Sequence, residues 1–536
     1  MQYQLADLFE SVVAKVPDRP ALIANRTLTY AELDARANQF AHHLREAGIG
    51  RGDHVGFHMK NGTEFVEGMI ACFKIGAVPV NVNYRYVEDE LRYLYDNADL
   101  ACLLFDTEFG ELVTTVAPEI DTFRHFVCVV QEGSQDAPRP EGTVEYESAL
   151  EGQPTTSDDL QDGRSPDDLY MLYTGGTTGM PKGVMWRHED MFFAGMGGGN
   201  PVGEPVSTPE ELAERISLEY AIKMFAAPPL IHGAAFLGTF IGFFQGSTVC
   251  LIRDYTGPGV LQMIQDHQIN TLSIVGDAMA LPLVEAGNSG DYELSSLGII
   301  STAGAVMSES VKQRLKEVMP NAFVLDAYGS SETGYNGTAT EDSSTDTGLK
   351  FRVTARTNVI SDDLKIVEPG SGVVGRVAQN GHIPVGYYND PEKTAATFPT
   401  IDGTRWILTG DSATVDEDGV IHFLGRGSVC INTGGEKVFP EEVEAALKAH
   451  ESIEDAIVAG IPDDKWGERV GAVIELRPGV TDEPTLEEVR EHLSTRIAGY
   501  KAPRDIEIVD KCLRSPAGKP DYGWAREVLA KAAANA

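Results

Sequence analysis

The stretch YTGGTTGMPKG, from Tyr173 to Gly183, is a loop of small residues that follows a short apolar run and carries one lysine. Glycines let backbone amides approach a polyanion, threonine hydroxyls donate hydrogen bonds, and Lys182 supplies a compact positive charge. This composition is typical of a phosphate-binding loop, although a generic glycine-rich surface loop fits it equally well. It is not a Walker A loop, because two residues separate Gly179 from the lysine and no Ser or Thr follows.

The length and charge of the chain limit what it can be. Its 536 residues exceed what one hydrophobic core usually serves, so we expect at least two domains. Hydrophobic residues make up 42% and charged residues 23%, as in ordinary globular proteins. The formal net charge of −38 repels nucleic acid and anionic membrane surfaces, and no nucleic-acid partner is expected. A phosphate-rich ligand would therefore need locally placed basic side chains.

Cysteine usage and the N-terminus bear on the compartment. The six cysteines are scattered without the paired spacing of a disulfide framework or a zinc site. The first residues are acidic and amphipathic, which is unlike a signal peptide. Both features predict a protein of the reducing cytoplasm.

One apolar run, from Gly233 to Ile252, is long enough to cross a membrane. Gln245, Ser247 and Thr248 interrupt it, and its four glycines weaken it as a lipid-facing helix. We therefore predict a buried helix followed by a buried strand, and no transmembrane segment.

Strand-like and helix-like periods alternate from residue 20 onward, which predicts an α/β fold of parallel sheets covered by helices. Thr29 and Glu32 form a capping box before an amphipathic helix that Gly48 stops. Residues 131–166 are acidic and contain Pro and Ser, so we expect a solvated excursion there. Further strands and helices are predicted at Val55–Met59, Glu64–Phe73, Val78–Val82, Glu88–Tyr95, Ala101–Phe105, Phe126–Val130, Gly246–Leu251, Val260–Gln268 and Thr271–Val275.

The pattern changes after residue 338. Short apolar runs broken by turns predict a small β-rich subdomain, interpreted as a barrel, at about residues 338–425. Beyond it, a helix at Glu441–Lys448, strands near residues 456–460 and 470–476, and a helix capped at Thr485 predict a compact α+β unit. The expected domains are residues 1–425 and 429–536, with the boundary at 426–428.

Four further motifs follow the opening loop in order: YGSSETG at 328–334, TGD at 409–411, GRGSVCINTGGEKVFPEEVE at 425–444 and RSPAGKPDY at 514–522. Together the five segments resemble the adenylate-forming superfamily of acyl-CoA synthetases, peptide-synthetase adenylation domains and luciferases. The resemblance covers nearly the whole chain. It implies a large N-terminal domain hinged to a small, mobile C-terminal one. The implied reaction uses ATP and Mg²⁺ to convert a carboxylate into an acyl-adenylate, which the thiol of coenzyme A then attacks.

The resemblance also implies roles for the N-terminal motif residues. Glu332 would bind Mg²⁺, although by itself it reads as a surface acid in a turn. Asp411 would bind the two ribose hydroxyls, and Ser331 would face the α-phosphate. The β- and γ-phosphates would be held by Thr174, Gly175, Gly176, Thr177, Thr178, Gly179 and Lys182. The adenine and the acyl group would lie against Tyr328, Gly329 and the segment Ala303-Gly304-Ala305.

In the C-terminal motifs, the resemblance makes Lys519 the catalytic lysine that reaches into the site during adenylation. Arg426 would open the hinge, where the chain departs from the family pattern by carrying Ser428 and Val429; the effect on the rate of domain alternation stays open. After rotation, the loop Thr433-Gly434-Gly435-Glu436-Lys437 would line the pantetheine tunnel. Weaker candidates for coenzyme A contact are Tyr500 and Lys501.

The acid is expected to be hydrophobic. His232 matches the family position that borders the acyl site, and a buried structural histidine is the other reading. Small residues follow it at 233–235 and recur at 303–305, which leaves volume for a bulky or branched acid. No acidic residue beside His232 would pair with an α-amino group, which disfavours an amino-acid substrate. Segments such as GDAMALPLV and RSPAGKPDYGWA resemble actinobacterial long-chain and steroid side-chain acyl-CoA ligases.

Two other functions stay open. The enzyme could stop at the adenylate and pass the acyl group to a carrier protein. A non-catalytic homologue that only binds nucleotide or acyl-CoA is the second alternative, supported only by the altered hinge. Sequence alone leaves the native acid, a homodimer and peripheral membrane association undecided.

Overall fold

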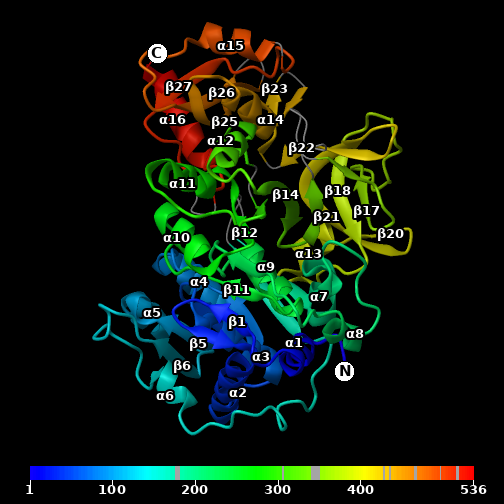
Figure 1. The fold of residues 1–536 in the computed structure, drawn as a ribbon. Helices are drawn as coiled ribbons and strands as arrows, with labels where there is room; N and C mark the ends of the chain where they lie inside the picture. Colours follow the sequence, from blue (N-terminus) through cyan, green and yellow to red (C-terminus); the bar gives the residue numbers. More distant parts are fainter. Residues whose placement is uncertain are drawn as a thin grey trace.

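The computed structural model of the chain describes residues 1–174, 181–304, 307–339, 350–426, 429–433, 436–463, 467–494, 496–514 and 518–535. Their strands form four sheets, two of eight strands, one of six and one of five. In Figure 1 the five-stranded sheet lies at the top with α14, α15 and α16, and the six-stranded sheet lies beside it on the right. The six-stranded sheet stands level with β14 and β12 of one large sheet, and the two large sheets carry most of the N-terminal sequence.

The two large sheets are mostly parallel, as the alternation of strands and helices predicts. The first has the order β15-β14-β13-β12-β10-β11-β1-β2, and only its two end pairs are antiparallel. The second has the order β19-β9-β8-β4-β3-β5-β6-β7, with antiparallel pairs at β8·β9 and β9·β19. Strands of the first sheet are β1 (Pro20–Ile23), β2 (Thr27–Thr29), β10 (Lys223–Ala226), β11 (Thr248–Cys250), β12 (Thr271–Ile274), β13 (Ile299–Thr302), β14 (Phe323–Ser330) and β15 (Gly334–Ala339). Strands of the second sheet are β3 (His54–His58), β4 (Val78–Asn81), β5 (Leu100–Asp106), β6 (His125–Val129), β7 (Val144–Glu145), β8 (Leu169–Thr174), β9 (Lys182–Arg187) and β19 (Gly386–Tyr387).

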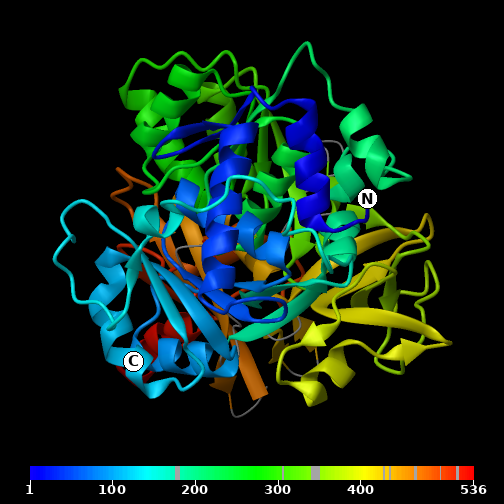
Figure 2. The same ribbon diagram turned by 90° about the horizontal axis from the view of Figure 1, so that it is seen from below.

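Helices cover both large sheets and fill the space between them. The dark-blue N-terminal helices lie between the green and the light-blue parts in Figure 2, and one hydrophobic cluster joins α1, α2, α3 and α9 to β8 and β9. The helices of this region are α1 (Leu5–Lys15), α2 (Tyr30–Glu46), α3 (Thr63–Ile75), α4 (Glu88–Asn97), α5 (Gly110–Val116), α6 (Tyr146–Leu150), α7 (His188–Gly195), α8 (Pro209–Glu214), α9 (Gly233–Phe244), α10 (Gly257–His267), α11 (Gly276–Ser289) and α12 (Glu309–Val318).

The remaining two sheets are smaller. The predicted β-rich region is an antiparallel sheet in the order β16-β22-β21-β18-β17, with β20 paired to β21. Within the described residues its end strands do not pair with each other, so the sheet has two edges there. Its elements are β16 (Lys350–Arg352), β17 (Thr357–Ile360), β18 (Gly375–Asn380), α13 (Pro391–Thr397), β20 (Thr400–Ile401), β21 (Thr404–Val415) and β22 (Val420–Arg426). The C-terminal elements are β23 (Ile431–Thr433), β24 (Glu436–Val438), α14 (Pro440–Lys448), β25 (Ile453–Asp463), β26 (Gly467–Leu476), α15 (Leu486–Ser494), β27 (Asp505–Val509) and α16 (Tyr522–Asn535).

Several local predictions are confirmed. Helix α2 begins after Thr29, and both hydrogen bonds of the predicted capping box are present. The apolar run from residue 233 forms helix α9 and then strand β11, and its phenylalanines pack in the core. Across the described residues, the search for a helix long and apolar enough to cross a membrane finds none.

The segment predicted as a solvated excursion, residues 131–166, is exposed over most of its length, but it also contains side chains that are buried, which was not predicted. Tyr146, Leu150 and Leu160 are 2 to 4% exposed, and the side chain of Arg164 is 2% exposed. Tyr146 donates a hydrogen bond of 2.9 Å to the buried Glu67 of α3. The segment is acidic overall, but its few apolar and basic residues pack against N-terminal helices that are distant in the sequence.

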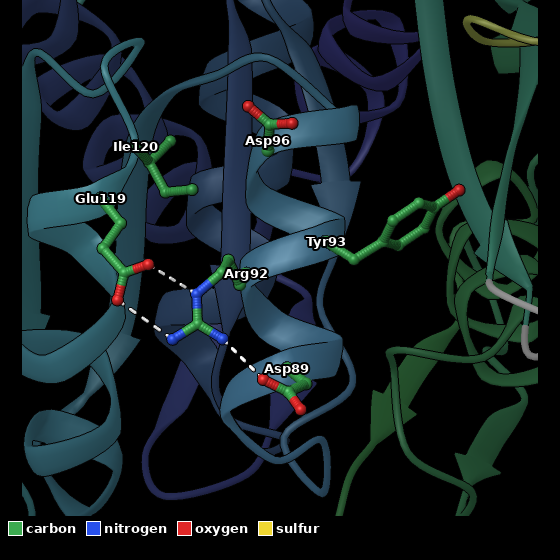
Figure 3. A pocket seen from close by; sticks show the side chains of 6 residues that line it. All are labelled: Asp89, Arg92, Tyr93, Asp96, Glu119 and Ile120. Carbon is green, nitrogen blue, oxygen red and sulfur yellow. Dashed lines mark hydrogen bonds and ion pairs between the residues drawn. The ribbon is translucent and has the colours of Figure 1, made fainter.

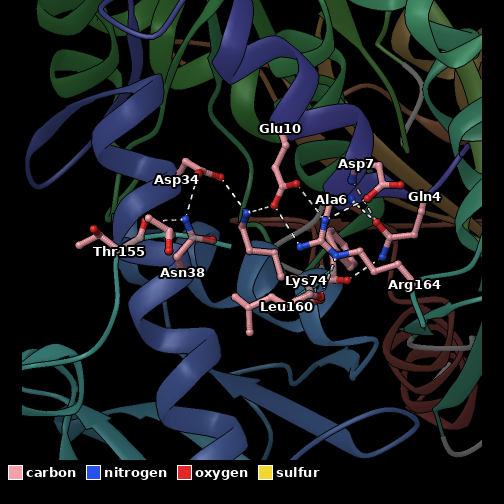
Figure 4. Close-up of polar contacts among 12 residues, drawn as sticks. Gln4, Ala6, Asp7, Glu10, Asp34, Asn38, Lys74, Thr155, Leu160 and Arg164 are labelled. Carbon is pink, nitrogen blue, oxygen red and sulfur yellow. Dashed lines mark hydrogen bonds and ion pairs between the residues drawn. The ribbon is translucent and has the colours of Figure 1, made fainter. Parts of the chain in front are cut away.

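Buried charges hold this segment to the N-terminal helices (Figure 4). Lys74, which is fully buried, forms ion pairs with Glu10 and, at 2.8 Å, with Asp34. Arg164 pairs with Asp7 and Glu10 at 2.9 Å each, and its Nε donates to the Lys74 carbonyl at 3.0 Å. Each buried cation thus has two carboxylate partners, which offsets much of the cost of removing it from water.

Substitution of Lys74 by Met should lower the free energy of unfolding by about 3 kcal/mol, because it leaves the carboxylates of Glu10 and Asp34 without their shared cation. Urea unfolding monitored by circular dichroism measures the change. The matched control is Lys365→Met, which removes a solvent-exposed pair with Asp363 and should change the free energy of unfolding far less. Equal effects of the two substitutions would contradict a stabilising role for the buried cluster.

Candidate functional site

The base of the glycine-rich loop is fixed by two paired strands. Thr174, at the end of β8, lies opposite Lys182, at the start of β9. Gly183 has no room for a side chain, since a Cβ there would lie 2.7 Å from the ring of Tyr173. The five predicted loop residues between these strands lie outside the described part of the chain: Gly175, Gly176, Thr177, Thr178 and Gly179.

Asn81, at the end of β4, holds the loop base and the segment before His232 together. The side-chain oxygen Oδ1 of Asn81 accepts a hydrogen bond from the Tyr173 backbone amide at 2.7 Å. Its side-chain nitrogen Nδ2 donates to the Tyr173 backbone carbonyl at 3.0 Å. The same nitrogen donates to the Ile231 carbonyl at 2.6 Å. Asn61 holds the same segment, with bonds to the Pro228 carbonyl and the Leu230 amide. Asn81 therefore fixes the distance between the phosphate-loop base and the predicted acyl histidine.

Lys182 and Glu332 are brought to the same tyrosine. The Lys182 ammonium lies 5.6 Å from the centre of the Tyr387 ring and 3.2 Å from a carboxylate oxygen of Asp390. The Tyr387 hydroxyl donates to Glu332 Oε1 at 3.1 Å, and burial together with this carboxylate raises the tyrosine pKa. The predicted phosphate lysine and the predicted metal ligand are thus neighbours across one aromatic ring.

The YGSSETG segment turns directly after β14. Ser330 and Thr333 exchange a hydroxyl hydrogen bond of 3.0 Å, and the Ser330 amide donates to the Thr333 hydroxyl. The carbonyl of Ser331 accepts from the buried Trp186 indole at 2.9 Å. Gly329 lies in β14 beside a bulge in its pairing with β15. These bonds fix the backbone that presents Ser331 and Glu332; for Tyr328 the structure describes only the backbone, within β14.

The predicted ribose ligand and the predicted hinge arginine are cross-strand neighbours. Asp411 in β21 lies opposite Arg426 in β22, and Asp411 is 4% exposed. The Asp411 amide donates to the Thr409 hydroxyl, which itself donates to the Val377 carbonyl at 2.9 Å. Only the backbone of Arg426 is described. Pairing in the sheet therefore brings the TGD motif and the start of the hinge segment together.

The predicted adenine edge follows β13. The Ala303 amide donates to the Ile274 carbonyl, and Gly304 has a φ of 81°, a conformation that favours glycine. Ala305 lies outside the described residues. A Cβ at Gly304 would make ordinary contact with Val275, at 3.7 Å, so the side chains of the described residues do not crowd this position.

The charge of Lys519, in the C-terminal part, acts on His232 in the N-terminal part. Burial lowers the pKa of His232 to about 4, and the positive charges of Lys519 and Arg85 add to the effect. His232 precedes the first residue of α9, and its amide donates to the Pro229 carbonyl. At neutral pH the imidazole is uncharged, so it does not repel the lysine. The structure thus brings together the predicted catalytic lysine and the predicted acyl-site histidine.

Several C-terminal predictions are only partly described. Ser428, Gly434 and Gly435 lie outside the described residues, and Lys437 is described only by its backbone in β24. Val429 is 5% exposed. Tyr500 is 43% exposed, and Lys501 pairs with Glu442 at 2.5 Å. The predicted coenzyme A contacts of this region remain predictions.

Glu332 fits a magnesium ligand. It is half-buried, offers hard oxygen donors and already accepts a hydrogen bond that orients it. Mg²⁺ typically takes one or two protein carboxylates and completes its shell with phosphates and water. Within the described residues, one group of three ligand-type side chains lies close together, at Asp455, Glu475 and Cys512. Arg514 occupies both oxygens of Asp455 there, so that group is a salt-bridge cluster.

A surface pocket of about 400 Å³ lies beside α4 (Figure 3). Arg92 donates two hydrogen bonds to Glu119 and one to Asp89, so its charge is already neutralised. Figure 3 shows Tyr93 pointing away from this cluster. None of the six lining residues belongs to the predicted motifs. The pocket therefore has no basic group left to bind a phosphate.

Sequence reasoning missed four residues of the site: Asn81, Arg85, Tyr387 and Asp390. The signal for Asn81 was present, since a polar residue at the carboxyl end of an apolar parallel strand lies where such sheets bind ligands. Tyr387 and Asp390 follow a loop of the β-rich region, and only the pairing of β19 with β9 brings them to Lys182.

The proximity of Lys519 and His232 is testable without activity. Substitution of Lys519 by Met should raise the His232 pKa from about 4 toward, but not to, 6.5, because one positive charge is removed while burial remains. An NMR titration of labelled histidines, assigned with a His232→Gln variant, measures the shift. Lys531→Met, on the exposed side of α16, is the control. An unchanged pKa in the Lys519 variant would show that the lysine does not lie at His232 in solution.

The chain matches two protein-family models and is similar over nearly its full length to known enzymes. The model of the AMP-binding enzyme family matches residues 9–388, and that of the AMP-binding enzyme C-terminal domain matches residues 442–519. The chain is 45% identical over 530 residues to a medium/long-chain-fatty-acid–CoA/3-oxocholest-4-en-26-oate–CoA ligase of Mycobacterium marinum, covering 98% of this chain and 96% of that protein. It is 44% identical over 537 residues to a 3-oxocholest-4-en-26-oate–CoA ligase of Rhodococcus rhodochrous, again covering 98% and 96%.

Solved structures show the same fold at lower identity. The anthranilate CoA ligase AuaEII in complex with anthranoyl-AMP gives a TM-score of 0.84 at 23% identity, over 100% of this chain and 98% of that one. ATP-bound MatB from Rhodopseudomonas palustris gives 0.81 at 23% identity, over 98% and 99%. The predicted α/β fold, with a large N-terminal and a smaller C-terminal part, is thereby confirmed. The chain belongs to the AMP-binding enzyme family, among its acyl-CoA ligases.

Proposed function

We propose that this chain is an ATP-dependent, AMP-forming carboxylic acid:CoA ligase that acts on a hydrophobic, bulky or branched acid. The observation that carries the proposal is the meeting of Lys182 and Glu332, the predicted phosphate lysine and the predicted metal ligand, at the ring and the hydroxyl of Tyr387. The charge of Lys519, which contributes to the low pKa of His232, supports it. Full-length similarity to fatty-acid and steroid-acid CoA ligases supports the same activity.

The first half-reaction joins two anions. An oxygen of the acid carboxylate attacks the α-phosphorus of ATP, the bond to the β-phosphate oxygen breaks, and pyrophosphate leaves. Lys182, oriented by Asp390 and Tyr387, lies at the end of the loop that would hold the leaving group. Lys519 offsets the charge of the carboxylate and the α-phosphate at the point of attack. Mg²⁺, held through Glu332 and phosphate oxygens, would neutralise part of the triphosphate charge.

In the second half-reaction the sulfur of coenzyme A attacks the acyl carbonyl and AMP leaves. We place the hinge for this step at residues 426–428. Its support is the distribution of the core: among the described residues, every hydrophobic cluster lies wholly before or wholly after that segment. A part that shares no apolar core with its neighbour can move as a rigid body.

The small residues of the predicted acyl segment support a large acid. Ala234 and Gly238 are half-buried along α9, and a Cβ at Gly238 would meet no atom closer than 3.9 Å. Gly304 has similar space. The relatives named for medium- and long-chain fatty acids and for 3-oxocholest-4-en-26-oate suggest that class of substrate. A cytoplasmic site of action fits the six cysteines, all of which are free thiols in the structure.

A panel of acids tests the proposal. We expect pyrophosphate release and acyl-CoA formation to be at least about a hundredfold faster with long-chain or sterol side-chain acids than with acetate, because each lost apolar contact costs about 1 to 3 kcal/mol. Coupled pyrophosphate detection and chromatography of the thioester measure both products. Pyrophosphate without acyl-CoA would favour transfer to a carrier protein. If no acid of the panel gave either pyrophosphate or acyl-CoA, the proposed ligase activity would be contradicted and only a binding role would remain.

Lys519→Ala separates the two half-reactions. It should slow acyl-adenylate formation by about a hundredfold or more, since the lysine stabilises charge that develops only at the α-phosphate. Thioester formation from supplied acyl-AMP should be unchanged. Lys531→Ala, remote from the site, is the control for expression and folding. Equal losses in both half-reactions would contradict the assigned role.

A further inference from the structure

We propose that Asp277 and Lys448 form a latch that holds the C-terminal part in the arrangement that makes the acyl-adenylate, and that Asp277 and Lys448 act as positioning residues for Lys519. The inference rests on the proposed function, because it concerns the first of the two half-reactions. Neither residue belongs to the predicted catalytic or binding set.

A chain of contacts leads from the latch to the catalytic lysine. Lys448, the last residue of α14, donates to Asp277 Oδ2 at 3.2 Å across the boundary between the two parts. Lys448 also lies 3.9 Å from Asp455 Oδ1 in β25. Arg514 donates to both oxygens of Asp455, at 2.6 and 2.7 Å, and to the Gly518 carbonyl at 3.0 Å. Gly518 directly precedes Lys519, so the backbone that carries the predicted catalytic lysine is connected to the latch through Arg514, Asp455 and Lys448.

The N-terminal end of this chain is also fixed. Asp277 lies in the first turn of α11, and its other oxygen accepts from the Ser308 amide at 2.8 Å. The Gly276 amide donates to the buried hydroxyl of Thr302, one residue before the predicted adenine edge. Asp277 is therefore a rigid anchor beside the nucleotide site, and the C-terminal part is held to it.

Charge and burial make this pair suited to reversible closure. The four side chains, two anions and two cations, are 9 to 16% exposed, so their pairing is poorly screened by water. Asp277–Lys448 is the member of the chain that crosses the boundary. When it opens, Lys448 keeps Asp455 as a carboxylate neighbour within its own part, so its ammonium group is not left buried without an anion.

A second pair crosses the same boundary. Arg314 of α12 donates to Glu454 of β25 at 2.6 Å, with the arginine side chain 29% exposed. Glu454 precedes Asp455 in the sequence, and among the described residues the structure records no bond from this pair to Gly518. It can add to closure, while the contact chain through Lys448 also orients Lys519.

The test is a comparison of half-reactions in Asp277→Asn and Lys448→Gln. Asparagine keeps an acceptor for Ser308 but loses the charge that holds Lys448. We expect adenylate formation, measured by rapid-quench pyrophosphate release with the best acid of the panel, to slow about tenfold in each variant. Thioester formation from supplied acyl-AMP should stay unchanged or become faster, because the C-terminal part no longer has to break the Asp277–Lys448 pair before it rotates. A residue that only stabilised the fold would slow both steps.

Two controls sharpen this result. The double variant Asp277→Asn/Lys448→Gln should be no slower than either single variant, because both remove one shared interaction. Arg469→Gln, which breaks an ion pair with Asp505 inside the C-terminal part, should leave the ratio of the two rates unchanged. The latch would be overturned if the effects of the two substitutions were additive in the double variant. It would also be overturned if Arg469→Gln slowed adenylate formation while leaving thioester formation unchanged, as the latch variants are expected to do.

A distance measurement keeps this inference separate from the proposed activity. Spin labels are attached at two exposed positions, Asp266→Cys on α10 and Arg490→Cys on α15. Pulsed electron paramagnetic resonance then measures the distance between the labels, which reports how far apart the two parts lie. One main distance is expected with Asp277 intact, and a second population should grow in Asp277→Asn. An unchanged distribution would overturn the latch even in an active enzyme. The appearance of the second population would support the latch even if no tested acid reacts.

Discussion

The geometry of the site depends on one buried amide. Asn81 ends a strand of the second sheet, and its three hydrogen bonds reach both the base of the phosphate loop and the segment before His232, which connects two elements of the first sheet. Asn61 and Trp186 also link the two sheets by hydrogen bonds, to the Pro228–Leu230 segment and to the Ser331 carbonyl, but Asn81 is the residue that binds both the loop base and the segment before His232. An asparagine at this point satisfies a backbone donor and two backbone acceptors at once, so movement of either segment would leave a buried polar group without a partner. The distance between the leaving-group end and the acyl end of the site is set there.

Charge is distributed so that an acidic protein can bind anionic substrates. The net charge of −38 opposes them at long range, and a few cations that the fold holds in place act locally. Lys182 is held by a carboxylate and an aromatic ring, which orient it without burying it. At the other end, burial keeps His232 neutral, since its pKa is about 4. A protonated imidazole would repel Lys519, so the low histidine pKa is a condition for the lysine to approach the acyl group.

Local sequence signals predicted the helices and strands. The features that the sequence did not predict depend on contacts between residues that are distant in the chain. The capping box at Thr29 and the helix–strand reading of the run from residue 233 depend on neighbours in the chain, and both are confirmed. The segment around Tyr146 and Arg164 was misjudged because its partners, Glu67 and Glu10, lie 79 and 154 residues away. The link between Lys182 and Glu332 was invisible for the same reason, since Tyr387 joins them only through strand pairing. Lys519 could be singled out only by family resemblance, because a tail lysine has no local signature.

The way the two parts meet explains how one chain can serve two reactions. A shared apolar core would make the adenylating arrangement stable but would cost far too much to open during each turnover. Within the described residues the cores stay separate, and ion pairs such as Asp277–Lys448 and Arg314–Glu454 cross the boundary. Ion pairs are directional, so they define one orientation, and water or an internal carboxylate can replace the partner when they separate. In the proposed latch, the contact chain through Asp455 and Arg514 couples the orientation of the C-terminal part to the position of Lys519, so we expect the lysine to reach its predicted place only when the two parts are closed on each other.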